Sequence, residues 1–170
     1  DTISKMGDKS TARQMMMKAG VPVVPGSDGA VKTPEEALKV AERIGYPVLV
    51  KASAGGGGRG MRRADSPEEL PTAMEQAGME AAAAFGDGTV YLEKLIINPR
   101  HIEVQVLGDQ HHNVIHLGER NCSIQRRNQK MLEEAPAFGL QESTRKTLCE
   151  AAVAAAKACD YEGAGTVEFV

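Results

Sequence analysis

The sequence predicts an α/β (α+β) fold whose first part is a split βαβ unit. Residues 23–95 contain apolar runs and helix-like segments in the order strand, helix, strand, strand, helix, strand, the order of a small α/β sandwich. An alternating strand segment, a polar stretch and an Ala-rich helix over residues 143–159 follow before a last strand-like segment. With 170 residues and 42% hydrophobic content, the chain can bury one ordinary core.

The first two helices are predicted over residues 8–19 and 33–44. The second has the clearer ends. Thr33 is its expected N-cap, Glu36 three residues later completes a capping box, and Gly45 stops the helix.

A third helix is predicted to begin at Ser66, where the same start pattern recurs with Glu69 three residues on. Pro71 lacks a backbone donor, so we expect a local irregularity just past the first turn of this helix.

Strands are predicted wherever short apolar runs lie between turn residues. In residues 101–106 the alternation is strict, with Ile102, Val104 and Val106 on one face and polar side chains on the other. The stretch from residue 119 to 136 is polar and poorly periodic, so it is predicted to be a loop with a short strand. The other predicted strands lie near residues 21–24, 46–53, 61–64, 89–96, 113–120 and 163–170.

Composition excludes several function classes. A net charge of −3, 4% aromatic residues and the absence of Trp argue against a general nucleic-acid binder. No apolar run approaches the roughly 20 residues that a membrane-spanning helix needs. Three cysteines without CxxC spacing are typical of reduced thiols. We therefore expect a cytoplasmic protein with neither a nucleic-acid nor a membrane partner.

The stretch KASAGGGGRGMRR, residues 51–63, places four consecutive glycines after a buried strand. A flexible linker would lie between domains, whereas strands flank this stretch. Gly55, Gly57 and Gly60 satisfy G-x-G-x-x-G, but no helix opens there, and the Gly-Lys-Ser/Thr of a P-loop is absent. The remaining interpretation is a glycine-rich turn whose backbone N–H groups approach phosphate oxygens, with Lys51 as a nearby cation.

Several motifs together resemble a known family. MGDK, KASAGGGGRGMR, EKLIINPRHIEVQVLGD, ERNCSIQRRNQK, EEAP and GAGTVEF occur in this order. They are similar to the biotin carboxylase component of biotin-dependent carboxylases, which are ATP-grasp enzymes, and the resemblance runs across essentially all of the chain. MGDKSTAR, VPGSDG, EAAAAFG and QRRNQK look most similar to the acetyl-CoA carboxylase type of bacteria and plastids. Propionyl-CoA carboxylase is the nearest competitor.

The resemblance implies a ligase that carboxylates biotin with bicarbonate and ATP, through carboxyphosphate. ATP and Mg2+ are the implied cofactors, with biotin as a carrier-bound substrate. The implied partners are a biotin carboxyl carrier protein or domain and a carboxyltransferase, and the full-length form resembles proteins that form homodimers. For the acetyl-CoA carboxylase type, the implied pathway is fatty acid biosynthesis.

The same resemblance implies three segments. Residues 1–22 would be a helical lead-in, residues 23–95 the lid subdomain of the ATP-grasp fold, and residues 96–170 the first part of its central subdomain. The chain begins without Met and ends in what looks like the middle of a strand. We therefore expect a piece of a larger protein that cannot complete the reaction alone, since the family's second Mg2+ carboxylate and its biotin-handling residues would lie beyond residue 170.

Site residues follow from the resemblance by position. Lys9 and Lys51 match nucleotide-phosphate lysines, and Lys130 matches a catalytic lysine near bicarbonate and the γ-phosphate. Glu168 matches the first of two Mg2+ carboxylates. The matches for the lid over the triphosphate are Gly55, Gly56, Gly57, Gly58 and Met61. The matches around adenine and ribose are Glu93, Lys94, Leu95, Ile96, His101, Gln125 and Asn128.

Two positions depart from the pattern. Asn128 stands where many members have His, and we interpret it as a branch marker that can still hydrogen-bond a ribose. Asn121 stands where Asp is usual. Two other functions stay open: a different ATP-grasp ligase, such as a purine-pathway or carbamoyl-phosphate enzyme, and a non-catalytic ATP-binding module. From the sequence pattern alone, His101 is equally well interpreted as a surface histidine.

Overall fold

The computed structural model describes residues 9–54, 60–126 and 129–170. Contacts divide them into two compact units, which are described separately. One unit, called the lid unit, holds residues 9–14 and 24–96; the other, called the sheet unit, holds residues 15–23 and 97–170. The elements are α2 (Lys9–Lys18), α3 (Pro34–Ile44), β1 (Val48–Ala52), β2 (Met61–Ala64), α4 (Leu70–Phe85), β3 (Val90–Lys94), β4 (Ile102–Gly108), β5 (Val114–Arg126), β6 (Gln129–Glu134), α5 (Glu142–Ala158) and β7 (Gly163–Phe169).

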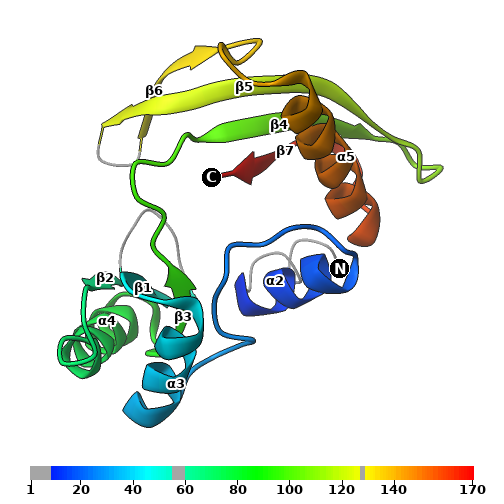
Figure 1. Cartoon of the computed structure of the whole chain (residues 1–170). Coiled ribbons are helices and arrows are strands. Elements are labelled where there is room, and N and C mark those ends of the chain that lie inside the picture. The colour runs from blue at the N-terminus through cyan, green and yellow to red at the C-terminus, as the bar shows by residue number, and fades with distance from the viewer. Residues whose placement is uncertain (1–8, 55–59, 127–128) are drawn as a thin grey trace. The chain divides into compact units, whose positions relative to one another are not determined.

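The lid unit is built on an antiparallel sheet with the strand order β2-β1-β3. Alternate residues of β1 and β3, such as Val50 and Leu92, join one buried cluster with side chains of α3 and α4. Figure 1 shows both helices beside this sheet. Because side chains alternate along a strand, Lys51, Tyr91 and Glu93 lie on the other face of the sheet, away from this cluster.

The ends of α3 are as predicted. The Thr33 hydroxyl accepts a hydrogen bond from the Glu36 N–H at 3.3 Å, and the Glu36 carboxylate accepts one from the Lys32 N–H at 2.9 Å. Gly45 follows with a φ of 76°, a conformation that suits glycine at a helix end. The capping box therefore fixes this helix from local sequence alone.

The predicted start of the third helix at Ser66 is wrong. Residues 66–69 form a turn, and α4 begins at Leu70 with Pro71 in its first turn. A proline at that position costs no helical hydrogen bond, because the first N–H groups of a helix have no internal acceptor. The Glu69 carboxylate instead accepts from the Asp65 N–H at 2.8 Å. The expected irregularity at Pro71 is thus the true start of the helix.

The strand predicted near residues 21–24 is also absent from the described structure. This part of the chain meets β3 only through isolated bridges, Gly26 with Glu93 and Val31 with Val90. Ser27 supports the contact, since its N–H donates to the Leu92 carbonyl at 2.9 Å. The apolar and proline-rich sequence here provides edge contacts to β3 without forming a ladder.

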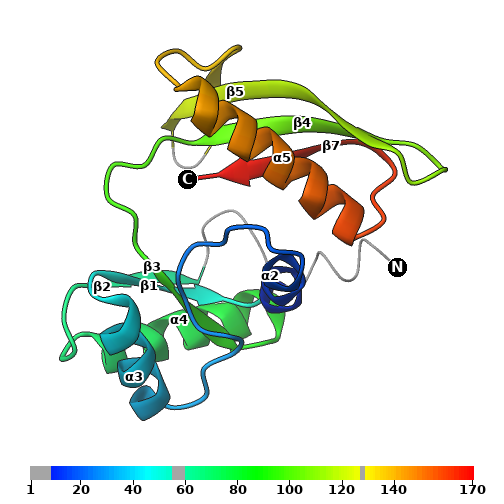
Figure 2. The same cartoon turned by 45° about the vertical axis from the view of Figure 1, so that its right-hand side comes forward.

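The sheet unit has an antiparallel sheet with the order β6-β5-β4-β7. Figure 2 shows α5 lying across one face of β5, β4 and β7. Val104 and Val106, predicted to share a buried face, pack there against Cys149, Ala152 and Ala156 of α5. Glu103 and Gln105, which alternate with these valines on β4, therefore face the other side of the sheet.

The polar stretch from residue 119 to 136 is mostly strand, which corrects the prediction of a loop with only a short strand. β5 continues to Arg126, and β6 returns beside it with Gln125 opposite Lys130. The residues after Asn121 extend past the start of β4, so this part is a two-stranded ribbon. Every residue of β6 is exposed, so a ladder forms without the apolar alternation by which a sequence reveals a half-buried strand.

A tight packing contact fixes the start of β7. The Tyr161 ring lies on Gly165, where an added Cβ would be 2.6 Å from the ring. Its hydroxyl donates to the Ala164 carbonyl at 3.1 Å. This position therefore needs a residue without a side chain.

Across the described part of the chain, no helix is both long enough and apolar enough to cross a membrane.

Candidate functional site

Charged side chains gather on the face of the four-stranded sheet that lies away from α5. Glu103 on β4 is directly opposite Glu168 on β7 and Arg120 on β5. Residues opposite each other in an antiparallel sheet share a face and lie close together. The register therefore brings together three charges from segments that are far apart in the sequence.

Lys130 joins the two carboxylates of this group. Its Nζ donates hydrogen bonds to Glu103 Oε2 and, at 2.5 Å, to Glu168 Oε1. His101 Nε2 lies 3.5 Å from the same Glu168 oxygen. The structure thus brings together three of the predicted site residues, Lys130, Glu168 and His101, around one additional carboxylate.

Glu103 is the residue that sequence reasoning missed. Its side chain is 1% exposed, and Arg120 Nη2 forms an ion pair with Glu103 Oε1. The same guanidinium donates to Gln105 Oε1 at 3.0 Å and lies 3.3 Å from the Glu133 carboxylate. The alternation in β4 placed Glu103 on the polar face beside His101, but only the register with β5 and β7 reveals its partners.

Both members of the Lys130–Glu103 pair are charged at neutral pH. Burial would raise the pKa of Glu103, but the Lys130 hydrogen bond and the Arg120 charge outweigh it and lower that pKa below its ordinary value. Burial would lower the pKa of Lys130, but its hydrogen bonds to Glu103 and Glu168 raise it well above the ordinary lysine value. Lys130 is consequently a fixed cation rather than a neutral base.

The same group contains donors that suit a divalent cation. Ligand atoms of His101, Glu103 and Glu168 all lie within 4.8 Å of one another. Carboxylate oxygens are the protein ligands that Mg2+ prefers, usually one or two together with phosphate oxygens and water. Glu168, with a half-exposed side chain, fits this description.

Gln125 belongs to β5 and lies opposite Lys130 of β6. The Gln125 side chain donates to the Cys122 carbonyl at 2.9 Å, so its amide is held against its own strand. Asn128 lies outside the described residues. Gln125 has no hydrogen bond to the group around Lys130 among the described residues.

In the lid unit, Lys51 is paired on the sheet face opposite the helices. Its Nζ donates to Glu93 Oε2 at 2.7 Å and lies 5.6 Å from the centre of the Tyr91 ring. Tyr91 is directly opposite Lys51 in the β1–β3 register. Burial would lower the pKa of Lys51, but the charge of Glu93 and the contact with Tyr91 raise it. This lysine is therefore also a fixed cation.

The segment after Glu93 is anchored by its own hydrogen bonds. The Lys94 ammonium donates to the carbonyls of Gly45 at 3.0 Å and Tyr46 at 2.7 Å, at the end of α3. The N–H of Leu95 donates to the Pro47 carbonyl at 3.1 Å, and the Ile96 side chain is partly exposed. Two donors of the Lys94 ammonium are thus engaged with carbonyls of the fold.

The remaining predicted residues are only partly described. Met61 lies opposite Lys51 on β2 and is half-buried. Lys9 is the first residue of α2. The lid glycines Gly55, Gly56, Gly57 and Gly58 lie outside the described residues.

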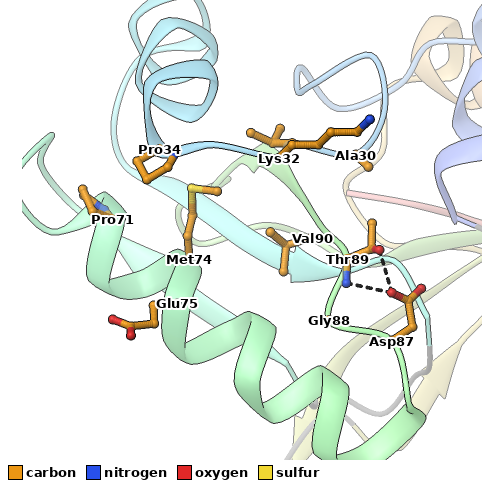
Figure 3. Close-up of a pocket in the computed structure, with 11 residues that line it drawn as sticks. Ala30, Lys32, Pro34, Pro71, Met74, Glu75, Asp87, Gly88, Thr89 and Val90 are labelled. Carbon is orange, nitrogen blue, oxygen red and sulfur yellow. Dashed lines mark hydrogen bonds between the residues drawn. The ribbon is translucent and has the colours of Figure 1, made fainter.

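A cavity of about 670 Å3 lies elsewhere in the lid unit, on the helix side of the sheet (Figure 3). Met74 of α4 and Val90 of β3 point into it, and the Lys32 side chain lies along its rim. Asp87 accepts hydrogen bonds from the N–H and hydroxyl of Thr89 at 2.9 and 2.6 Å. None of the predicted site residues that the structure describes lines this cavity.

A family profile described as "Carbamoyl-phosphate synthase L chain, ATP binding domain" matches residues 8–170. The chain belongs to this family. Within it, the chain is 62% identical over 170 residues to "Biotin carboxylase 2, chloroplastic" of Populus trichocarpa, covering all of this chain and 32% of that protein. The chain therefore spans about a third of the length of this relative.

Solved structures of biotin carboxylases are similar to this chain over almost all of its length. A biotin carboxylase β,γ-ATP complex from Campylobacter jejuni matches with a TM-score of 0.94 and 60% identity, over 99% of this chain and 38% of that one. The biotin carboxylase domain dimer of Hydrogenobacter thermophilus 2-oxoglutarate carboxylase, in complex with MgADP, ADP and bicarbonate, matches with a TM-score of 0.91 and 57% identity, over 98% and 37%. The predicted ATP-grasp α/β fold of this ATP-binding family member is confirmed.

Proposed function

We propose that the chain is part of a biotin carboxylase, a ligase that uses ATP to carboxylate biotin with bicarbonate. The observation that carries the proposal is the fixed Lys130 cation between Glu103 and Glu168. Similarity to about a third of the length of biotin carboxylases, over essentially all of this chain, supports it. Phosphoryl transfer relies on positioning and charge neutralisation more than on a protein nucleophile, and this group offers a cation and metal-binding carboxylates.

In the sheet unit, we propose that Lys130 is catalytic and neutralises bicarbonate and the γ-phosphate. Glu168 would hold Mg2+, a cation that neutralises phosphate charge when it is bound. His101, Gln125 and Asn128 would contact the adenine and ribose. Glu103 and Arg120 keep Lys130 charged and in position, as the hydrogen bonds and pKa directions support.

In the lid unit, Lys51 would neutralise nucleotide phosphates, with Lys9 in the same role. The glycines from Gly55 to Gly58, together with Met61, would cover the triphosphate, and residues 93–96 would meet the adenine, chiefly through their backbone. We propose residues 23–95 as the lid subdomain, which the compact unit over residues 24–96 supports. Residues 1–22 would lead into it, and residues 96–170 would begin the central subdomain.

Among biotin-dependent carboxylases, we assign the chain to an acetyl-CoA carboxylase, which would act in fatty acid biosynthesis in the cytoplasm. A biotin carboxyl carrier protein or domain would bring biotin, a carboxyltransferase would take the carboxyl group onward, and the full-length protein would be a homodimer. The alternative is the biotin carboxylase part of a propionyl-CoA, other acyl-CoA or pyruvate carboxylase. The similarity to relatives from pyruvate and propionyl-CoA carboxylases favours keeping this alternative.

Steady-state kinetics of the purified full-length protein test the proposal. ATP cleavage should require bicarbonate and increase with free biotin or a biotinylated carrier. Lys51→Met should raise KM for ATP at least about tenfold, the loss of roughly one charge-assisted phosphate contact. Lys39→Met, on the exposed face of α3, is the matched control and should leave KM unchanged. ATP cleavage that ignores both bicarbonate and biotin would contradict the proposal, and calorimetric MgATP binding without cleavage would indicate a non-catalytic module.

A further inference from the structure

We propose that the Lys130 ammonium occupies the place of the metal cation at Glu168, and that metal binding there breaks the Lys130–Glu168 bond and makes the lysine available to an anion. This inference rests on the proposed function, because that function makes Glu168 the metal ligand. Glu168 would exchange one cation, the Lys130 ammonium, for another. The lysine would then have one more free donor for bicarbonate or a phosphate oxygen.

The position of the ammonium carries the inference. Lys130 Nζ is hydrogen-bonded to carboxylates from two different strands, Glu103 on β4 and Glu168 on β7. One ligand atom from each of these carboxylates and one from His101 lie within 4.8 Å of one another. The ammonium therefore bonds the same two carboxylates that a divalent cation would use. Glu168 Oε1 cannot give its full charge to a metal while it accepts this hydrogen bond.

The two bonds of Lys130 differ in how easily they break. Glu103 is buried with a 1% exposed side chain and is also paired with Arg120. Glu168 is 52% exposed. Breaking a buried ion pair leaves an uncompensated buried charge, whereas an exposed pair contributes little. Exchange should therefore occur at Glu168, while Glu103 retains Lys130.

Charge and donor capacity explain the coupling. An ammonium has three donors, and two are engaged by the carboxylates here. Loss of the Glu168 bond frees one donor of the ammonium. The remaining bond to Glu103 keeps the lysine charged and in place. Because coupling between two ligands is reciprocal, an anion on Lys130 should also strengthen metal binding at Glu168.

Mn2+ titration of the full-length protein without nucleotide, followed by electron paramagnetic resonance, tests the competition. Lys130→Met should tighten Mn2+ binding by about threefold to tenfold, the range expected when a partly exposed ion pair no longer competes. Lys146→Met is the matched control: Lys146 is an exposed lysine of α5 paired with Glu150 at 3.8 Å, and its loss should change nothing. Unchanged or weaker Mn2+ binding in Lys130→Met would overturn the proposal.

Further variants separate this result from other causes. Glu168→Gln should weaken Mn2+ binding and remove the effect of Lys130→Met, whereas binding insensitive to Glu168→Gln would overturn the metal assignment. Bicarbonate should tighten Mn2+ binding in the wild type and lose that effect in Lys130→Met. Lys130→Gln, which keeps a neutral donor, replaces Lys130→Met if thermal melting shows that the latter does not fold. Failure of the proposed function would instead appear as ATP cleavage independent of biotin, with the metal competition intact.

Discussion

Glu103 and Glu119 are two buried carboxylates in the same sheet, and they differ in what they hold. Glu119 faces α5: its Oε1 accepts from Arg145 Nε at 2.9 Å and from the Ala137 N–H at 3.0 Å. Glu103 faces away from α5 and holds Lys130 and Arg120. Both side chains are at most 2% exposed. Burial and ion pairing alone therefore do not distinguish a structural carboxylate from a functional one.

The difference lies in the partner of each carboxylate. Glu119 connects the start of α5 and the segment after β6 to the sheet. Its hydrogen-bond donors, Arg145 and the Ala137 N–H, stabilise the fold. Glu103 holds a lysine that also reaches the half-exposed Glu168. A carboxylate whose partner is shared with an exposed group is linked to whatever that group binds, and variants of the two glutamates should separate stability from activity.

The largest expected effect is on catalysis. Glu103→Gln should lower the rate of bicarbonate-dependent ATP cleavage in the full-length protein about a hundredfold, equivalent to about 2.7 kcal/mol of barrier. The neutral amide keeps the shape of the side chain but removes the charge that holds Lys130 in place. Kinetics at saturating ATP measure this. An activity within twofold of wild type would show that Glu103 serves the fold in the way Glu119 does.

Stability should respond most to the other carboxylate. Glu119→Gln should lower the free energy of unfolding by about 2 kcal/mol, since Arg145 loses its buried partner. Urea denaturation measures the change, and activity per folded molecule should remain near wild type. Glu142→Gln is the control, because Glu142 contacts the same Arg145 but is 82% exposed. If Glu142→Gln destabilises the protein equally, the burial of Glu119 does not explain its contribution to stability.

Acid titration should sharpen the same comparison. Burial raises the pKa of Glu119, but Arg145 and backbone hydrogen bonds lower it overall, and the pKa of Glu103 is also lowered from an ordinary 4.5. A lowered folded-state pKa contributes stability that is present above pH 4.5 and is lost as pH falls through the folded value. The urea concentration at the unfolding midpoint should therefore decline as pH falls from about 6 to 3. This decline should be less steep in Glu119→Gln than in the wild type. An identical slope in the variant would contradict the assignment.

The smallest effect is expected in the lid unit, where Lys51 and Lys94 form a similar contrast. Lys94→Met should cost about 1 kcal/mol of stability, because the carbonyls of Gly45 and Tyr46 lose their donor. Its KM for ATP should stay near wild type, unlike that of Lys51→Met. Thermal melting and kinetics on the same preparation measure both. A raised KM in Lys94→Met would show that this lysine serves the ligand as well as the fold.

Local sequence predicted the elements whose ends are fixed by neighbouring residues. Thr33, Glu36 and Gly45 determine α3 because capping acts over three or four residues. The strict alternation of β4 likewise predicted its buried face. β5 and β6 were missed beyond residue 119, because an exposed ribbon is held by cross-strand hydrogen bonds and needs no apolar pattern.

The candidate site shows the same limit. Lys51, Lys130, Glu168 and His101 were singled out through motifs. Glu103 required the register of four strands, since Arg120, Lys130 and Glu168 are 17, 27 and 65 residues away from it and lie on three other strands. Pairing over such distances depends on the topology of the whole sheet, and no local propensity encodes it.

The contact between Tyr161 and Gly165 limits how this protein can vary. Gly165 lies three positions before Glu168 on β7, and even a methyl group there would meet the aromatic ring. A library of variants at Gly165 should therefore tolerate almost no substitution unless residue 161 becomes small at the same time. Natural or engineered sequence diversity at these two positions would be coupled, although neither side chain belongs to the charged group around Lys130.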